Sequence, residues 1–274
     1  MLSRSRVLQS TTGKRRRRRR LKVRLLLGGS IITLLCGGFI FLLHSSSIRI
    51  EKVYPVGNNL LSDEDVREVA REALLGNYFY LIPKNNIFLY PRDRIEHGLL
   101  TQFKEIKNME VSFKDFKSIT ITLSERIPRA LWCAQKESSE CYFVDESGFI
   151  FRKVDRYNEN LVTYVVPLEG EPIGQTLLTA EQFMATDSFL QKLKEQEITI
   201  IAVTFKEGGV REGEMSVGGT IIWNADQDLT VALENLKTLI DSPQFKSKDS
   251  DGNLVVEYID IQNNNKIFYK ARGK

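Results

Sequence analysis

The chain has 274 residues, of which 42% are hydrophobic and 27% charged, a composition typical of a globular protein. Its formal net charge of +4 is unevenly distributed, because residues 1–24 hold 11 of the 39 Lys and Arg residues and no Asp or Glu. The rest of the chain therefore carries 28 basic against 35 acidic side chains. An acidic body argues against nucleic-acid binding as the main function, even though the tail is rich in arginine.

An uncharged and mostly apolar run follows the basic tail, from Leu25 to Leu43. As a helix, these 19 residues reach about 28 Å, close to the ~30 Å hydrocarbon core of a bilayer. Lys and Arg favour the cytoplasmic side of such helices. The sequence therefore predicts a cytoplasmic tail at 1–24, a transmembrane helix at 25–43 and an extracytoplasmic remainder. Beside the membrane, the tail is expected to set the topology and to bind anionic lipid headgroups.

Two further features of this segment leave alternatives open. A cleaved signal peptide has a similar basic start, although its apolar core is usually only about 7–15 residues long, and Ser45 and Ser47 would provide small residues for cleavage. Gly29, Thr33 and Gly37 lie four residues apart and would let a second helix approach closely. Glycine is also frequent in membrane helices without such a role.

Residues 47–127 predict the order strand, helix, helix, strand, strand. A strand within 47–59 ends near Gly57, Ser62 has the character of a helix cap, and Pro91 begins a second helix. The first strand and the two helices carry apolar residues at the appropriate spacing: Ile48, Ile50 and Val53; Val66, Val69, Ala70, Ala73 and Leu74; Ile95, Leu99 and Phe103.

Two alternating segments end this region and predict a β-hairpin. Their apolar positions are Met109, Val111 and Phe113 in one strand, and Ile119, Ile121 and Leu123 in the other. The turn between the strands lies at 114–118. We expect the two helices to cover one face of the small sheet that results.

Residues 128–274 predict a β-rich domain with a curved, mostly antiparallel sheet and flanking helices. The expected strands lie at 149–154, 163–166, 198–205, 215–217, 220–223, 254–261 and 266–270, and the expected helices lie at 179–196 and after Asp226 or Asp228. Gly218-Gly219 is expected to form a hairpin turn. Within 198–205, simple alternation places Ile200 and Ala202 on one face, and Ile201 and Val203 on the other.

Of the three cysteines, Cys36 lies in the apolar run, whereas Cys133 and Cys141 flank a seven-residue connection between two expected strands. In an oxidising compartment a disulfide across this hairpin is expected, and a pair of free thiols is the alternative. Closing so short a loop corresponds to about 2.5 kcal/mol in the chain-entropy estimate. Neither a metal site nor a cofactor site is expected, because zinc would need two more ligands and no histidine lies nearby in sequence.

Few residues point to catalysis. The chain has two histidines: we expect His44 at the membrane edge and His97 on a helix surface. The sequence contains no G-x-S-x-G, H-E-x-x-H or P-loop pattern. A non-enzymatic function is therefore expected.

Several motifs, in order and behind a single apolar helix, resemble the FtsQ/DivIB family of bacterial cell-division proteins. They are the strand that ends at Gly57-Asn58, the E-R-x-P motif of Glu125 to Pro128, the V-D-x-x-G motif of Val144 to Gly148, Pro167 to Gly170, and the paired segments Tyr258 to Gln262 and Lys266 to Lys270. The chain departs from the family at Gln262, where arginine is frequent, so a role of that arginine does not carry over.

The resemblance implies an α+β protein with a POTRA domain at 47–127 and a second, β-rich domain at 128–274. It also implies a single-pass protein of the plasma membrane that serves as a scaffold at the division septum. Its partners would be FtsB/DivIC-type and FtsL-type membrane proteins, bound in part by addition of a strand to the last strands of the chain. The matching positions here are Asn263, Lys266, Ile267, Phe268 and Tyr269. Alternation alone would bury one of the two aromatic residues, Phe268 or Tyr269.

Two other interpretations stay open. A POTRA protein of secretion or outer-membrane assembly would be expected to have several POTRA repeats or a downstream barrel, and neither is evident in the sequence. An envelope enzyme tethered by the same helix would need a catalytic constellation, which the motifs above do not provide.

Overall fold

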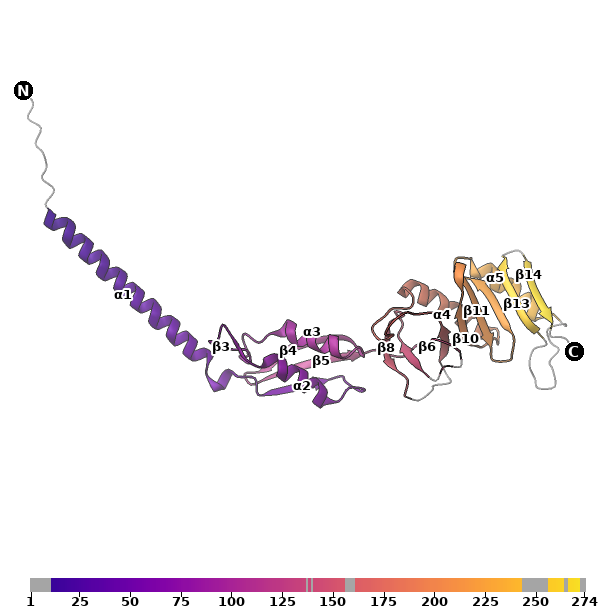
Figure 1. Ribbon diagram of the computed structural model, residues 1–274, viewed down its shortest axis with the longest axis horizontal. Helices are drawn as coiled ribbons and strands as arrows, with labels where there is room; N and C mark the ends of the chain where they lie inside the picture. The colour runs from indigo at the N-terminus through magenta and orange to yellow at the C-terminus, as the bar shows by residue number, and fades with distance from the viewer. Residues whose placement is uncertain are drawn as a thin grey trace, which may run out of the picture. The chain divides into compact units, whose positions relative to one another are not determined.

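The computed structural model describes residues 11–136, 138, 140–155, 161–242, 256–263 and 266–271, and the side chains from residue 21 onward. It is a mixed α+β protein with one long N-terminal helix and a large mixed sheet (Figure 1). Its contacts define two compact units, Met1–Gln102 with Asn108–Leu123, and Phe103–Lys107 with Ser124–Lys274.

The N-terminal helix α1 extends over Thr11–Leu43 and so includes the arginine run as well as the apolar segment. Its part Leu21–Leu43 is long and apolar enough to cross a membrane, with a mean hydropathy of 2.3 in its most apolar window. The expected N-terminal apolar helix is thus present. The first ten residues of the predicted basic tail lie outside the described residues.

The first unit continues with short elements around a three-stranded sheet. They are η1 (Ser46–Ile48), β1 (Lys52–Val56), α2 (Asp63–Leu74), β2 (Asn77–Tyr78), β3 (Ile82–Pro83), α3 (Arg92–Gln102), β4 (Ile106–Asp115) and β5 (Ser118–Glu125). The sheet order is β1-β5-β4, with β1 parallel to β5, and β2 and β3 pair separately as a small antiparallel hairpin.

Local sequence explains how the two helices of this unit begin and pack. Ser62 caps α2, because its Oγ accepts a hydrogen bond from the Asp65 amide at 3.1 Å. Helix α2 buries Val66 fully, and α3 buries Ile95 and Leu99. Gly98 allows the two helices to approach closely, since a Cβ atom at this position would lie 3.1 Å from Val69 Cγ1.

Two expectations for this unit were wrong, and one element was missed. The first strand begins at Lys52, because Ser46–Ile48 form a 3₁₀ turn capped by Ser45. The β2–β3 hairpin was not predicted, because two-residue strands are too short to show a period. Phe113 was expected on the apolar face of its strand, but its side chain is 54% exposed.

The second unit is built on a nine-stranded sheet. Its elements are β6 (Ala130–Cys133), β7 (Cys141–Val144), β8 (Ile150–Lys153), β9 (Val162–Val165), α4 (Ala180–Glu195), β10 (Ile200–Phe205), η2 (Glu207–Gly209), β11 (Val210–Met215), β12 (Thr220–Asn224), α5 (Leu229–Ile240), β13 (Val256–Asn263) and β14 (Lys266–Ala271). The strand order is β14-β13-β12-β11-β10-β9-β6-β7-β8.

This sheet is more mixed than expected. Among the described strands, five of the eight neighbouring pairs are antiparallel, and the pairs β9–β10, β6–β9 and β12–β13 are parallel. The three parallel pairs join strands that are separated along the chain by other elements. Helices α4 and α5 begin where the sequence indicated, at the capping box of Thr179 with Gln182 and at the cap residue Asp228.

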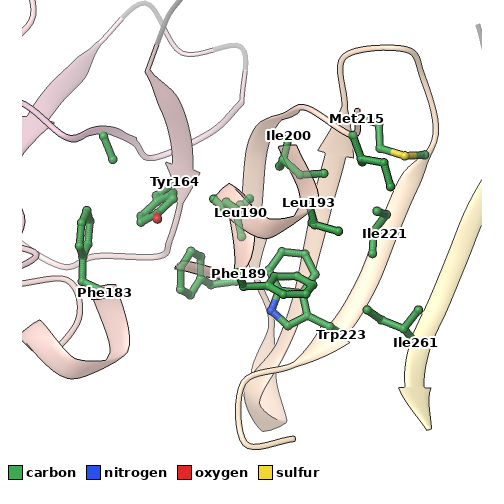
Figure 2. Close-up of a cluster of buried hydrophobic side chains, with 14 of the residues drawn as sticks. Tyr164, Phe183, Phe189, Leu190, Leu193, Ile200, Met215, Ile221, Trp223 and Ile261 are labelled. Carbon is green, nitrogen blue, oxygen red and sulfur yellow. The ribbon is translucent and has the colours of Figure 1, made fainter. Parts of the chain in front are cut away.

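The core of this unit is formed by residues of the sheet and of helices α4 and α5. Figure 2 shows part of this cluster. The Phe189 ring of α4 packs against Trp223 of β12, with 5.1 Å between ring centroids. The Tyr164 ring lies near Phe183, at 5.7 Å, and near Phe205, at 5.4 Å. These contacts join α4 to strands β9 and β12 of the sheet.

A β-bulge in strand β10 changes which of its residues face the core, so the expected alternation was wrong for this strand. The register against β11 shifts between Ile200 and Ala202. Ile200 and Val203 therefore both face the core, and Ile201 is left 43% exposed. Simple alternation had placed Val203 on the opposite face, because an inserted residue is not visible in the sequence pattern.

Candidate functional site

Strand β14 lies at one edge of the nine-stranded sheet and pairs on its inner side with β13 (Figure 1). Ile259 lies opposite Tyr269, and Asp260 lies opposite Phe268. In the described part of the chain no strand pairs with the outer side of β14. An edge strand in this position presents a row of backbone N–H and C=O groups to solvent.

The side chains of β14 are more exposed than the alternating pattern indicated. Phe268 is 55% exposed and Tyr269 is 43% exposed, so neither aromatic residue belongs to the core. Ile267 is half-buried and packs against the main core cluster. The expectation that one aromatic residue would be buried was therefore wrong. Helix α5 contacts β14, and Ile267 packs against the core, but both aromatic side chains stay exposed.

A shallow hollow of about 500 Å³ lies next to this edge, and its lining residues are Gln227, Asp260, Gln262, Asn263 and Phe268. Gln227 supports the hollow, because its Nε2 donates a hydrogen bond to the Ile261 carbonyl at 2.7 Å. Its Oε1 accepts one from the Asn224 amide at 2.8 Å. The hollow therefore joins predicted residues from both strands of the hairpin to a loop before α5. Gln227 was missed, since nothing in the sequence links it to residues more than 30 positions away.

The β13–β14 hairpin is irregular near this hollow. The register between the strands shifts between Asp260 and Asn263. The Asp260 carboxylate accepts a hydrogen bond from the Gln262 amide at 2.9 Å. Gln262, which stands where the similar family often has arginine, lines the hollow and carries no charge. Residues 264–265 lie outside the described residues.

The positive charges of β14 are placed at its two ends. Lys266 is exposed at the start of the strand, and Lys270 Nζ lies 2.7 Å from a carboxylate oxygen of Glu257. The hydrogen bond to Glu257 raises the pKa of Lys270 above its ordinary value. Between these charges, the exposed surface of the strand is aromatic.

Two of the motifs that carried the family resemblance meet in a buried ion pair. Arg126 Nη1 donates to Oδ2 of Asp145, which is fully buried. Asp145 Oδ1 also accepts hydrogen bonds from the Ser147 amide, at 2.8 Å, and from the Ser147 hydroxyl, at 2.6 Å. A third bond comes from the Phe149 amide at 3.1 Å. This carboxylate therefore organises the whole turn between β7 and β8.

The Arg126 side chain makes two further contacts besides the ion pair. Arg126 Nε donates to the Lys104 carbonyl at 3.0 Å, and the guanidinium lies 4.1 Å from the centre of the Phe149 ring. Burial raises the pKa of Asp145, but the hydrogen bonds from Ser147 and Arg126 outweigh it and leave the pKa below its ordinary value. The hydrogen bonds of both side chains go to neighbouring groups of the fold, so we assign the motifs a structural purpose.

Gly148 completes the V-D-x-x-G turn. Its φ angle is +77°, and a Cβ atom at this position would lie 2.5 Å from the Leu178 carbonyl oxygen. A side chain would therefore clash with backbone that cannot move aside easily, and only glycine fits this position without strain.

Cys133 and Cys141 form a disulfide in the structure. They lie directly opposite each other in the antiparallel β6–β7 pair, with 4.5 Å between their Cα atoms. Both are buried, and Cys36 is a free cysteine in α1.

The two histidines lie on different helices, and the surface position expected for His97 is confirmed. The Nδ1 atom of His44 lies 3.0 Å from the Ile40 carbonyl at the end of α1, and His97 is exposed on α3. Within the residues whose placement is described, no group of three or more His, Cys, Asp or Glu could hold a metal ion.

Comparison with models of known protein families gives no match to this chain, and comparison with curated proteins gives none either.

Proposed function

We propose that the protein is a membrane-anchored scaffold of the bacterial division machinery, of the FtsQ/DivIB kind, without catalytic activity of its own. The observation that supports this best is the edge position of β14, where two aromatic side chains are exposed and no described strand pairs with the outer side. Through this edge it would bind FtsB/DivIC-type and FtsL-type membrane proteins at the septum.

The chemistry of such an edge suits strand addition. A partner segment in extended conformation would pair with the outer backbone groups of β14 and so gain affinity that depends little on its sequence. Phe268 and Tyr269 would then lie next to the partner's side chains, and Lys266 would favour an acidic neighbour. The hollow beside Gln227 and Phe268 offers room for one side chain of the added strand.

Two further observations support the family resemblance. Residues 52–125 follow the order β-α-α-β-β of a POTRA domain, with the β2–β3 hairpin as an addition. The Arg126–Asp145 pair gives one structural purpose to two motifs that lie 19 residues apart. A secretion-related POTRA protein or a tethered envelope enzyme is the alternative, and the exposed edge gives neither of them a specific role.

Co-purification tests the proposal. The full chain and the double variant Phe268→Ala/Tyr269→Ala would be co-expressed in membranes with FtsB/DivIC-type and FtsL-type proteins of the same host. Because both aromatic residues are exposed, the variant should fold normally, and we expect recovery of the partners to fall at least about tenfold, in line with loss of interface hot spots.

Met184→Ala provides a matched control, because Met184 is 59% exposed on α4 of the same unit. This control should recover the partners as well as the unsubstituted chain does. Truncation after Gln262 should abolish recovery altogether. Undiminished co-purification by the truncated chain would contradict the assignment of the site to β14.

A further inference from the structure

The first unit exposes six large apolar side chains on two neighbouring parts of its chain, which we call the apolar rim. Its members and their exposed fractions are Phe79 at 88%, Tyr80 at 96%, Leu81 at 54%, Phe88 at 63%, Phe113 at 54% and Phe116 at 59%. Isolated exposed apolar residues are common on protein surfaces, but several large ones together indicate contact with another apolar phase.

The backbone of the β2–β3 hairpin holds the most exposed members of the rim outward. Phe79 has a φ angle of 47° and Tyr80 one of 62°, which are left-handed values that residues other than glycine rarely adopt. The Leu81 amide donates to the Tyr78 carbonyl at 2.9 Å and closes the tip. The chain thus adopts an unfavourable conformation that leaves both rings in solvent.

This hairpin is tied to the end of the membrane helix. Strand β3 lies beside the C-terminal end of α1 (Figure 1). Asn86, whose side chain is fully buried, donates from Nδ2 to the carbonyl of Leu43, the last residue of α1, at 2.9 Å. The Ile87 amide donates to the Ile48 carbonyl at 3.0 Å. Phe88, the next residue, is thereby held near the point where the chain leaves the helix.

The region around the β4–β5 turn places the remaining two rim residues, Phe113 and Phe116, near the end of α1 as well. The amide of Glu51 donates to the Lys117 carbonyl at 2.8 Å. The Phe116 ring lies 6.3 Å from Phe88 and 5.9 Å from Phe113 in edge-to-face arrangements. Two separate loops therefore place their aromatic residues close to residues 43–51, immediately after α1.

We propose that the apolar rim inserts into the lipid leaflet at the Leu43 end of α1. Aromatic side chains favour the interface between hydrocarbon and headgroups, and the hydrogen bonds to Leu43 and Ile48 keep the rim at that depth. The inserted rim would set the orientation of the first unit relative to the membrane. This inference depends on α1 spanning a bilayer, and it does not depend on a role in division.

Fluorescence quenching by lipid tests the insertion. The full chain would be reconstituted into vesicles of phospholipid brominated near the glycerol end of the acyl chains, with a single tryptophan introduced by Tyr80→Trp. The two natural tryptophans, Trp132 and Trp223, are both buried, and their signal is subtracted with the unsubstituted protein. The substitution is conservative, because residue 80 is 96% exposed and keeps an aromatic side chain.

Two further variants calibrate the measurement. Leu60→Trp reports on an exposed site after β1, which separates this site along the chain from residues 43–51, and Phe39→Trp reports on α1 itself. We expect at least about twofold quenching of the introduced tryptophan in Tyr80→Trp and in Phe39→Trp, and nearly none in Leu60→Trp, as interfacial insertion requires.

Each outcome is decisive. Quenching in Phe39→Trp without quenching in Tyr80→Trp would overturn the insertion of the rim while leaving the anchor in place. Absence of quenching in Phe39→Trp would overturn both. Equal quenching in Leu60→Trp would mean that the unit lies flat on the lipid without a specific rim, and it would also overturn the proposal.

Discussion

Asp145 shows how a single buried charge organises a turn. Its carboxylate is inaccessible to water and accepts bonds from Ser147, Phe149 and Arg126. A buried charge is tolerated only where it is paired and hydrogen-bonded, since desolvation would otherwise exceed the Coulombic gain. Removing one partner therefore lowers the free energy of unfolding by more than the intact pair contributes to it.

We predict that Asp145→Ala lowers the free energy of unfolding of the second unit by about 3 kcal/mol, because it leaves the Arg126 guanidinium without its partner. Urea denaturation of the full chain in detergent, followed by tryptophan fluorescence, measures this unit, since Trp132 and Trp223 both belong to it. Asp155→Ala is the control. Asp155 is 82% exposed and lies 3.9 Å from Arg152, so its loss should change stability by less than about 0.5 kcal/mol.

The Arg126–Asp145 pair also predicts that the free energy of unfolding depends on pH. The folded-state pKa of Asp145 lies below the ordinary value of 3.8, so its contribution to stability is complete above that value. The contribution is lost as the pH falls through the folded-state pKa. The difference in unfolding free energy between the unsubstituted chain and Asp145→Ala should therefore be constant near neutral pH and should narrow below about pH 4. If this difference in unfolding free energy does not change down to pH 2, the Asp145 carboxylate is not the stabilising group.

At the scale of elements, the β6–β7 hairpin joins two strands by backbone pairing and by the disulfide between Cys133 and Cys141. Replacing both cysteines by serine should lower the free energy of unfolding by about 2.5 kcal/mol, because the unfolded chain regains the freedom of the closed loop. In protein isolated from its native envelope without reductant, mass spectrometry should show that neither cysteine is alkylated until a reductant is added. Alkylation of both thiols without reduction would refute the bond.

Elements with strong local signals were predictable from sequence. The caps Ser62, Thr179 and Asp228 all begin helices in the structure, as their side-chain chemistry favours. The terminal hairpin is also present, from Val256 to Ala271 with its turn outside the described residues. What could not be predicted is non-local: the parallel pairings, the bulge at Ile200, and the meeting of Arg126 with Asp145.

The candidate site was predictable only in part, for the same reason. The positions of β14 came from a resemblance, and their exposure depends on what covers the sheet, which the sequence does not state. Alternation buries every second residue only where another layer lies against that face. At β14 the contact with α5 leaves Ile267 half-buried, whereas Phe268 and Tyr269 both stay exposed. Gln227 entered the site only through its contact with Ile261.

The whole molecule combines an apolar N-terminal helix, a first unit with an apolar rim, and a second unit with an open sheet edge. Each feature is unfavourable for a protein alone in water, and each is explained if it meets a membrane or a partner strand. We propose that these surfaces serve a scaffold at the division septum.

Live imaging tests that claim most directly. An N-terminal fluorescent fusion of the full chain would be expressed in the native host while the endogenous copy is depleted. The account predicts a fluorescent band at mid-cell, and filamentous cells when no copy is supplied. A uniform envelope signal together with normal division after depletion would contradict the account, and free cytoplasmic fluorescence would show that α1 is cleaved rather than retained as an anchor.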